Sequence, residues 1–129
     1  MTIGRMENAK PQSGVDPIER LRRDLHRFTA DRNWEQFHTP KNLAIALSVE
    51  AGELLEHFQW LTADQSEKLS GNRLMHVRQE LADVFLYLLS LSDRLRVDLV
   101  AAAFEKIELN AKKYPVELAK GTAKKYTEL

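Results

Sequence analysis

Apolar residues recur every three or four positions along most of the chain, which is the spacing of a helix that buries one face. The first such stretch begins at Asp16-Pro17, where an N-cap residue precedes a proline at the first helical position. The pattern predicts a helix that ends near Asp31. Its apolar face consists of Ile18, Leu21, Leu25 and Phe28.

A second cap-then-proline signal, Thr39-Pro40, opens a strongly apolar segment. This signal predicts a helix over residues 41 to about 59. A capping box that begins at Thr62 then predicts a short helix, which we expect Gly71 to end. Residues 33–38, which are rich in aromatic side chains, are predicted to form a connecting loop.

Two longer helices follow the short one. The apolar pattern predicts a long helix from about Arg73 to Arg94, and Asp98 caps a last helix that must stop before Pro115. Because no strand pattern or internal repeat accompanies these segments, the fold class is predicted to be all-α, a bundle of four to five helices. Residues 1–15 lack an apolar period and are expected to be a flexible leader, so the domain covers residues 16–129.

The helices over 41–59 and 73–94 are apolar on nearly every side. A helix of this kind must be buried on every side, and 129 residues supply too little material to do so within one chain. We therefore expect a homo-oligomer, either a homodimer or a homotetramer.

The composition narrows the classes of partner. There are 19 Lys+Arg against 19 Asp+Glu, so no overall field attracts a nucleic acid polymer or a membrane surface. Cysteine is absent, which excludes disulfides and thiolate metal sites. The longest apolar run, residues 84–89, is far shorter than the roughly 20 residues that span a bilayer. Without a secretory signal, the expected location is cytoplasmic.

Two pairs of acids lie inside the two apolar helices. Glu50 and Glu53 form one pair and Glu80 and Asp83 the other, each at a spacing of i, i+3 that places both carboxylates on one helix face. None of the four has Lys or Arg four residues before or after it. Acids on helices are usually solvated or paired, so four without a cationic neighbour predict a site for a cation.

Oxygen ligands favour a hard divalent ion. Unpaired carboxylates about 5 Å apart repel by about 3 kcal/mol at an effective dielectric near 20, and a divalent ion relieves this repulsion. Mg²⁺ is the expected cofactor and Mn²⁺ the alternative, and such ions serve phosphate-ester and anhydride hydrolysis. A di-iron centre would need helical Glu-x-x-His motifs, whereas Glu35 and His38 lie in a loop. The competing hypothesis is a non-enzymatic helical oligomerisation or adaptor module with an acidic patch.

The acidic motif also carries a family resemblance. Glu50-x-x-Glu53, a 26-residue spacer and Glu80-x-x-Asp83 resemble the signature of the all-α, MazG-like nucleoside triphosphate pyrophosphohydrolases. Flanking segments at 34–38, 41–43, 58–60, 97–99 and 125–129 resemble the branch that acts on dCTP. The resemblance implies Mg²⁺-dependent hydrolysis of a nucleoside triphosphate, most readily dCTP or a modified dCTP, to the monophosphate and pyrophosphate. It makes the four acids both metal ligands and catalytic residues.

The resemblance also implies residues that bind the nucleotide. Lys106, Asn110 and Tyr114 share a polar stripe on the last helix; Lys106 is expected to contact phosphate and the other two the sugar or base. The base pocket is expected to hold Trp34, Trp60, His38 and Tyr87. The alternatives are a solvated face for the stripe and a core position for the tryptophans. His26 and His57 are expected to be ordinary surface or satisfied residues.

Overall fold

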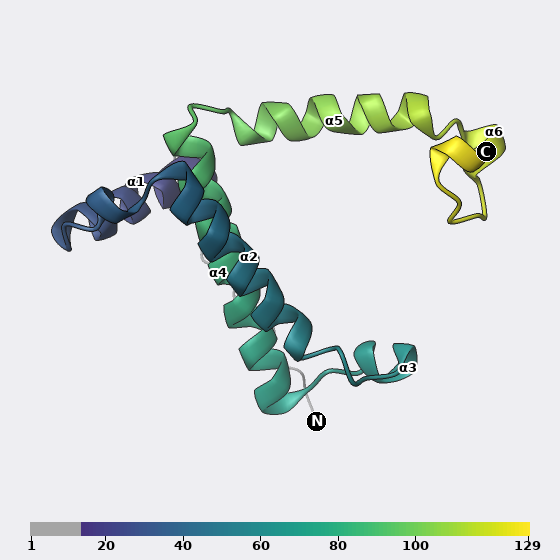
Figure 1. Ribbon diagram of the computed structural model, residues 1–129, viewed down its shortest axis with the longest axis horizontal. Coiled ribbons are helices and arrows are strands. Elements are labelled where there is room, and N and C mark those ends of the chain that lie inside the picture. The colour runs from purple at the N-terminus through teal and green to yellow at the C-terminus, as the bar shows by residue number, and fades with distance from the viewer. Residues whose placement is uncertain (1–13) are drawn as a thin grey trace.

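The computed structural model describes residues 14–129, and the regular elements in this range are all helical (Figure 1). The first thirteen residues of the predicted leader lie outside the described residues. In chain order the elements are α1 (Pro17–Asp31), the 3-10 turn η1 (Glu35–Phe37), α2 (Pro40–Glu56), α3 (Ala63–Ser66), α4 (Gly71–Arg94), α5 (Leu99–Lys113), α6 (Val116–Ala119) and η2 (Tyr126–Glu128). The predicted all-α class is confirmed.

The predicted helix starts are confirmed by their capping hydrogen bonds. The backbone N–H of Ile18 donates to the Asp16 side chain at 3.2 Å, and that of Asn42 donates to the Thr39 hydroxyl oxygen at 3.2 Å. A third cap lies at Asp98, whose carboxylate accepts from the backbone of α5 at 3.0 Å. Each bond satisfies one of the orphan N–H groups of a first turn.

Two predicted helix ends are wrong by several residues. Helix α2 ends at Glu56 rather than near residue 59, and the chain passes through turns to Trp60. Helix α3 stops at Ser66, well before Gly71. Gly71 has a φ of +58°, a left-handed conformation that glycine adopts without steric cost, and it begins the long helix instead of ending the short one.

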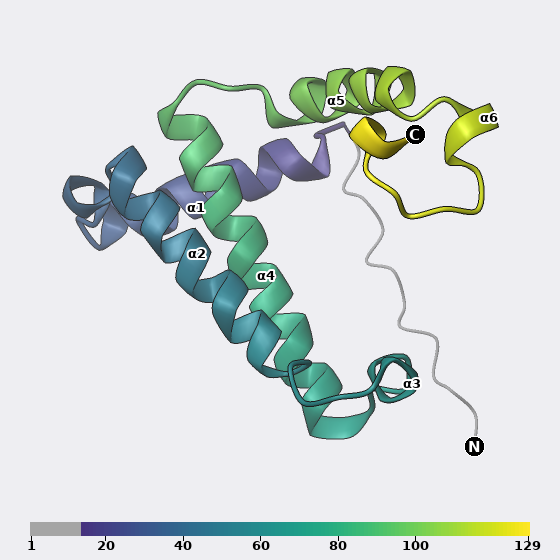
Figure 2. The ribbon, with the colours of Figure 1, turned by 45° about the vertical axis from the view of Figure 1, so that its right-hand side comes forward.

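The centre of the fold is an antiparallel pair of helices, α2 and α4, which lie side by side along much of their length (Figures 1 and 2). The buried apolar residues of the described chain are Leu43 on α2 and Val77 and Leu89 on α4. Helix α1 crosses α4, and an ion pair between Arg22 of α1 and Asp93 of α4 joins them. The α2–α4 pair is the scaffold that positions the acids.

Helix α5 extends away from the α2–α4 pair instead of packing along it (Figure 1). Among the described residues, extensive contacts between helices are confined to α2 with α4 and α1 with α4. The apolar face of α5 is therefore open to solvent, with Phe104 exposed by 68% and Ile107 by 65%. None of the helices described over residues 14–129 is long and apolar enough to cross a membrane.

Candidate active site

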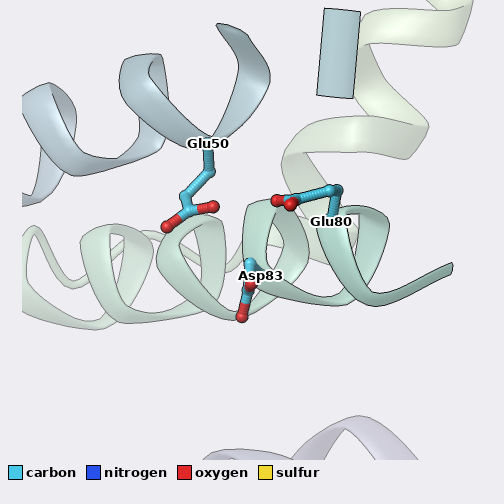
Figure 3. A group of neighbouring side chains, drawn as sticks. All are labelled: Glu50, Glu80 and Asp83. Carbon is cyan, nitrogen blue, oxygen red and sulfur yellow. The ribbon is translucent and has the colours of Figure 1, made fainter. Parts of the chain in front are cut away.

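Three carboxylates meet where α2 faces α4 (Figure 3). Glu50 reaches across from α2 toward Glu80 and Asp83, which lie one turn apart on α4. Each of the three contributes one oxygen, and these oxygens all lie within 4.8 Å of one another. Such a group can ligate a cation from two sides, because the ligands come from two packed helices rather than from one.

Two oxygens of this group are buried without a partner. Glu50 Oε2 and Glu80 Oε2 are inaccessible to solvent and accept no hydrogen bond. A buried carboxylate oxygen without a donor is costly, and native structures rarely retain one without a compensating group. A bound cation would supply that compensation. The donor set therefore fits a hard divalent ion.

The burial and the mutual repulsion of these acids change the pKa of Glu50. The pKa of its carboxyl is raised from 4.5 to about 7, with burial as the largest cause and the neighbouring acids Glu53, Glu80 and Asp83 as the others. Both causes disfavour the charged form. In the absence of a cation, the carboxylates are too close to be ionised together without penalty.

Glu53 lies beside this group rather than within it. Its carboxyl lies close enough to raise the pKa of Glu50, but none of its oxygens belongs to the three-oxygen group of Glu50, Glu80 and Asp83. The ion pairs of residues 14–129 join Arg22 to Glu19 and Asp93, and His26 to Glu35. None of the four predicted acids is thus neutralised by a basic side chain of the described chain.

Three of the predicted base-pocket residues lie next to helix ends, whereas Tyr87 lies within α4. Trp34 precedes η1 and packs edge-on against Phe28, with ring centroids 5.7 Å apart. Trp60 follows α2 and is 87% exposed. His38 lines a small cavity of about 70 Å³ between α1, α2 and α4, and Tyr87 is half-buried one turn beyond Asp83. The cavity at His38 is lined by none of the other three.

The predicted nucleotide ligands of the last helix are carried away from the acids. Lys106 and Asn110 lie exposed on α5, and Tyr114 caps its end with its ring edge-on to Tyr126 at 6.1 Å. Because α5 points away from α2 and α4 (Figure 1), a single chain does not bring these residues to the acidic group.

Two features of the structure have no counterpart in the sequence analysis. One is the Arg22–Asp93 ion pair, which spans 71 positions of sequence and has no local signal. The other is a close approach of His57 and His76, whose rings lie 6.1 Å apart. Both are contacts between different helices, which helix periodicity does not predict.

The fold and site together define an all-helical protein with a carboxylate centre suited to a divalent cation. Comparisons with known proteins agree with this class. The family model described as the MazG-like family matches residues 45–129. The chain is 42% identical over 121 residues to dCTP pyrophosphatase 1 of Homo sapiens, which covers 92% of this chain and 69% of that protein. It is 43% identical over 119 residues to the Bos taurus protein of the same name, covering 91% and 70%.

A solved structure matches as well. The crystal structure of a pyrophosphatase from Archaeoglobus fulgidus has a TM-score of 0.75 and 40% sequence identity, and the match covers 79% of this chain and 95% of that one. The chain belongs to the MazG-like family. The matched range, residues 45–129, contains the four acids.

Proposed function

We propose that this protein is a nucleoside triphosphate pyrophosphohydrolase that converts dCTP, or a modified dCTP, to the monophosphate and pyrophosphate. The observation that carries the proposal is the group formed by Glu50, Glu80 and Asp83, with its two buried and unpartnered oxygens. The substrate follows from relatives about 40% identical that are named dCTP pyrophosphatase 1. An adaptor module would gain nothing from carboxylates buried without partners.

The cofactor in this proposal is Mg²⁺, with Mn²⁺ as the alternative. The ligands would be Glu50, Glu80 and Asp83, joined by Glu53 one turn along α2. When bound, the metal supplies neutralisation of the triphosphate charge and lowers the pKa of a bound water. All four ligands offer oxygen alone, which favours these ions over the softer transition metals.

The acids would also share the proton chemistry. Hydrolysis breaks the bond between the α-phosphorus and the bridging oxygen of the β-phosphate, and the attacking water gives up a proton as its oxygen bonds to phosphorus. Glu53 is the acid that we assign to accept this proton, because its carboxyl lies at the edge of the proposed metal site, beside the three-oxygen group rather than within it. Pyrophosphate then departs with the bridging oxygen.

A second copy of the chain would complete the nucleotide site. Lys106, Asn110 and Tyr114 cannot reach the acids of their own chain, because α5 extends away from them. The apolar face of α5 borders an open cavity of about 1130 Å³ that also involves α1 and α4, and burial of this face would drive association. We therefore propose a homodimer or homotetramer in which the polar stripe of α5 faces the acids of a partner.

The aromatic residues would bind the base. Trp60 is almost fully exposed and is free to stack on a planar ring, and base stacking on an aromatic side chain contributes about 1 to 3 kcal/mol. Trp34, His38 and Tyr87 are the other members of the proposed base pocket. Stacking does not distinguish one base from another, so preference for cytosine would come from hydrogen bonds to its edge.

The test is incubation of the purified chain with dCTP and MgCl₂, with the products followed by ³¹P NMR. We expect dCMP and pyrophosphate, and the Glu50→Gln variant should lose at least about 100-fold in turnover, since changes outside the first ligand sphere already cost about 10–100-fold. Glu56→Gln, which alters an exposed acid at the end of the same helix, is the matched control and should keep the parental rate.

Two results would contradict the proposal. Release of dCDP and orthophosphate would show that the enzyme breaks the bond between the β- and γ-phosphates instead. Full activity in Glu50→Gln, or equal losses in Glu50→Gln and Glu56→Gln, would show that the three-carboxylate group is not the reaction centre.

A further inference from the structure

Two histidines lie opposite each other on the same pair of helices that carries the acids. His57 is the C-cap residue of α2 and His76 lies in the second turn of α4. Their imidazole rings are 6.1 Å apart between centroids and within 6° of parallel. Neither ring takes part in an ion pair within residues 14–129.

The position of the pair follows from the helix register. His57 lies one turn beyond Glu53 on α2, and His76 lies one turn before Glu80 on α4. Along the line where the two antiparallel helices meet, the carboxylates therefore lie one helical turn away from the imidazoles. The available ligand atoms change from oxygen to nitrogen within that single turn.

The spacing of the rings suits a shared ion. An imidazole nitrogen binds Zn²⁺ at about 2.0–2.1 Å, so two nitrogens on one tetrahedral ion lie roughly 3.4 Å apart. Centroids 6.1 Å apart leave room for that arrangement, provided that each ring turns a nitrogen toward the gap. The outer torsion of histidine is broad, and His76 is exposed, so this rotation meets little resistance.

We propose that His57 and His76 form a binding site for one borderline divalent transition-metal ion, such as Zn²⁺ or Ni²⁺, separate from the carboxylate centre. The two imidazoles supply two ligands and water supplies the others. Imidazole nitrogen prefers Zn²⁺, Ni²⁺ and Cu²⁺, whereas Mg²⁺ prefers the oxygens of the acids. The bound ion joins the end of α2 to the beginning of α4 and thereby stabilises the folded helix pair.

The probe is Ni²⁺, titrated by calorimetry into the untagged full-length chain in excess MgCl₂, so that Mg²⁺ competes for the carboxylates. We expect one Ni²⁺ per chain, and a rise in melting temperature with Ni²⁺. His57→Gln and His76→Gln should each weaken Ni²⁺ binding by roughly 100-fold, because each removes one arm of a chelate. His26→Gln, which alters a histidine of α1, is the control and should bind as the parent does.

Spectroscopy identifies the ligands independently of affinity. With Cu²⁺ in place of Ni²⁺, electron paramagnetic resonance should show coupling to two imidazole nitrogens in the parent and to one in either variant. The proposal is overturned if the parent fails to bind Ni²⁺ in excess Mg²⁺, or if both histidine variants bind it as tightly as the parent. Loss of Ni²⁺ binding in Glu50→Gln alone would also overturn it, by placing the ion among the carboxylates. None of these readouts depends on hydrolysis of dCTP.

Discussion

Glu50 illustrates how a single side chain takes its properties from its neighbours. Its side chain is half-buried where α2 faces α4 and lies near three other acids, so that its pKa rises to about 7. In water the same carboxyl would be ionised at neutral pH. The cost of keeping this group in the folded protein is the strongest local sign that a cation belongs beside it.

The stability of the metal-free protein should therefore fall as the pH rises from about 4.5 to about 7. The unfolded chain loses the Glu50 proton near pH 4.5 while the folded chain keeps it to about pH 7, so the folded state binds more protons across this window and ΔG of unfolding decreases. Thermal melts in EDTA measure this directly. Mg²⁺ should raise the melting temperature more at pH 8 than at pH 5.

Glu50→Gln provides the control for this pH dependence. Glutamine does not titrate, so the decrease in stability should be smaller in the variant, and its metal-free melting temperature at pH 8 should equal or exceed that of the parent. A variant that is markedly less stable than the parent at pH 8 would show that Glu50 has a structural partner.

Trp60 is the residue whose exposure most directly points to a ligand. Trp60→Ala should raise KM for dCTP by about one to two orders of magnitude, the factor that a stacking contribution of about 1 to 3 kcal/mol implies. Its exposure predicts little change in stability. Trp60→Phe keeps an aromatic face and should recover most of the affinity. An unchanged KM in Trp60→Ala would remove this residue from the base pocket.

Helix α2 supplies one side of the site. It contributes Glu50 and Glu53 to the four acids of the site, and it contributes Leu43 to the buried core against α4. Its start is fixed by the Thr39 cap and by Pro40 at the first helical position. A defined start sets the rotation of the helix, and therefore which residues face α4.

Removal of this cap should be measurable. Thr39→Ala leaves the backbone N–H of Asn42 without its acceptor and should lower the free energy of unfolding by about 1 kcal/mol. Urea unfolding at one fixed protein concentration measures the change. Thr39→Ser retains the hydroxyl and should stay close to the parent; equal losses in both variants would mean that the hydroxyl is not the stabilising group.

Over residues 14–129, some helices pack against each other, whereas α5 leaves its apolar face exposed to solvent. Helix α4 packs against both α1 and α2, whereas α5 presents Phe104 and Ile107 to solvent. Exposed apolar surface of this extent on a small protein is typical of an interface. The same helix carries residues that we expect to bind the nucleotide, so association and catalysis should depend on one another.

The parent should sediment as a dimer or larger at micromolar concentration, and its melting temperature should rise with protein concentration. Ile107→Asp places a charge on the apolar face of α5 and should shift the protein toward smaller species with a loss of turnover. Glu105→Gln, on the same helix, is the control and should leave both properties unchanged. A stable, fully active monomer by analytical ultracentrifugation would contradict the proposed assembly.

The sequence alone was sufficient for the helices and for the acidic pairs. Caps at Asp16, Thr39 and Asp98 and the apolar period depend on residues within one or two turns, so they can be read without knowledge of the fold. The same is true of the i, i+3 spacing that puts Glu80 and Asp83 on one face. The boundaries near residues 59 and 71 were wrong because loop geometry decides where a helix stops.

Only the tertiary structure decided which faces meet. The approach of Glu50 to Glu80 and Asp83 and the contact of His57 with His76 both depend on how α2 packs against α4. Packing of this kind is set by burial summed over many residues that are distant in sequence, and no local pattern records it. The identity and the spacing of the acids can therefore be predicted from the sequence, whereas their convergence into one site depends on the fold.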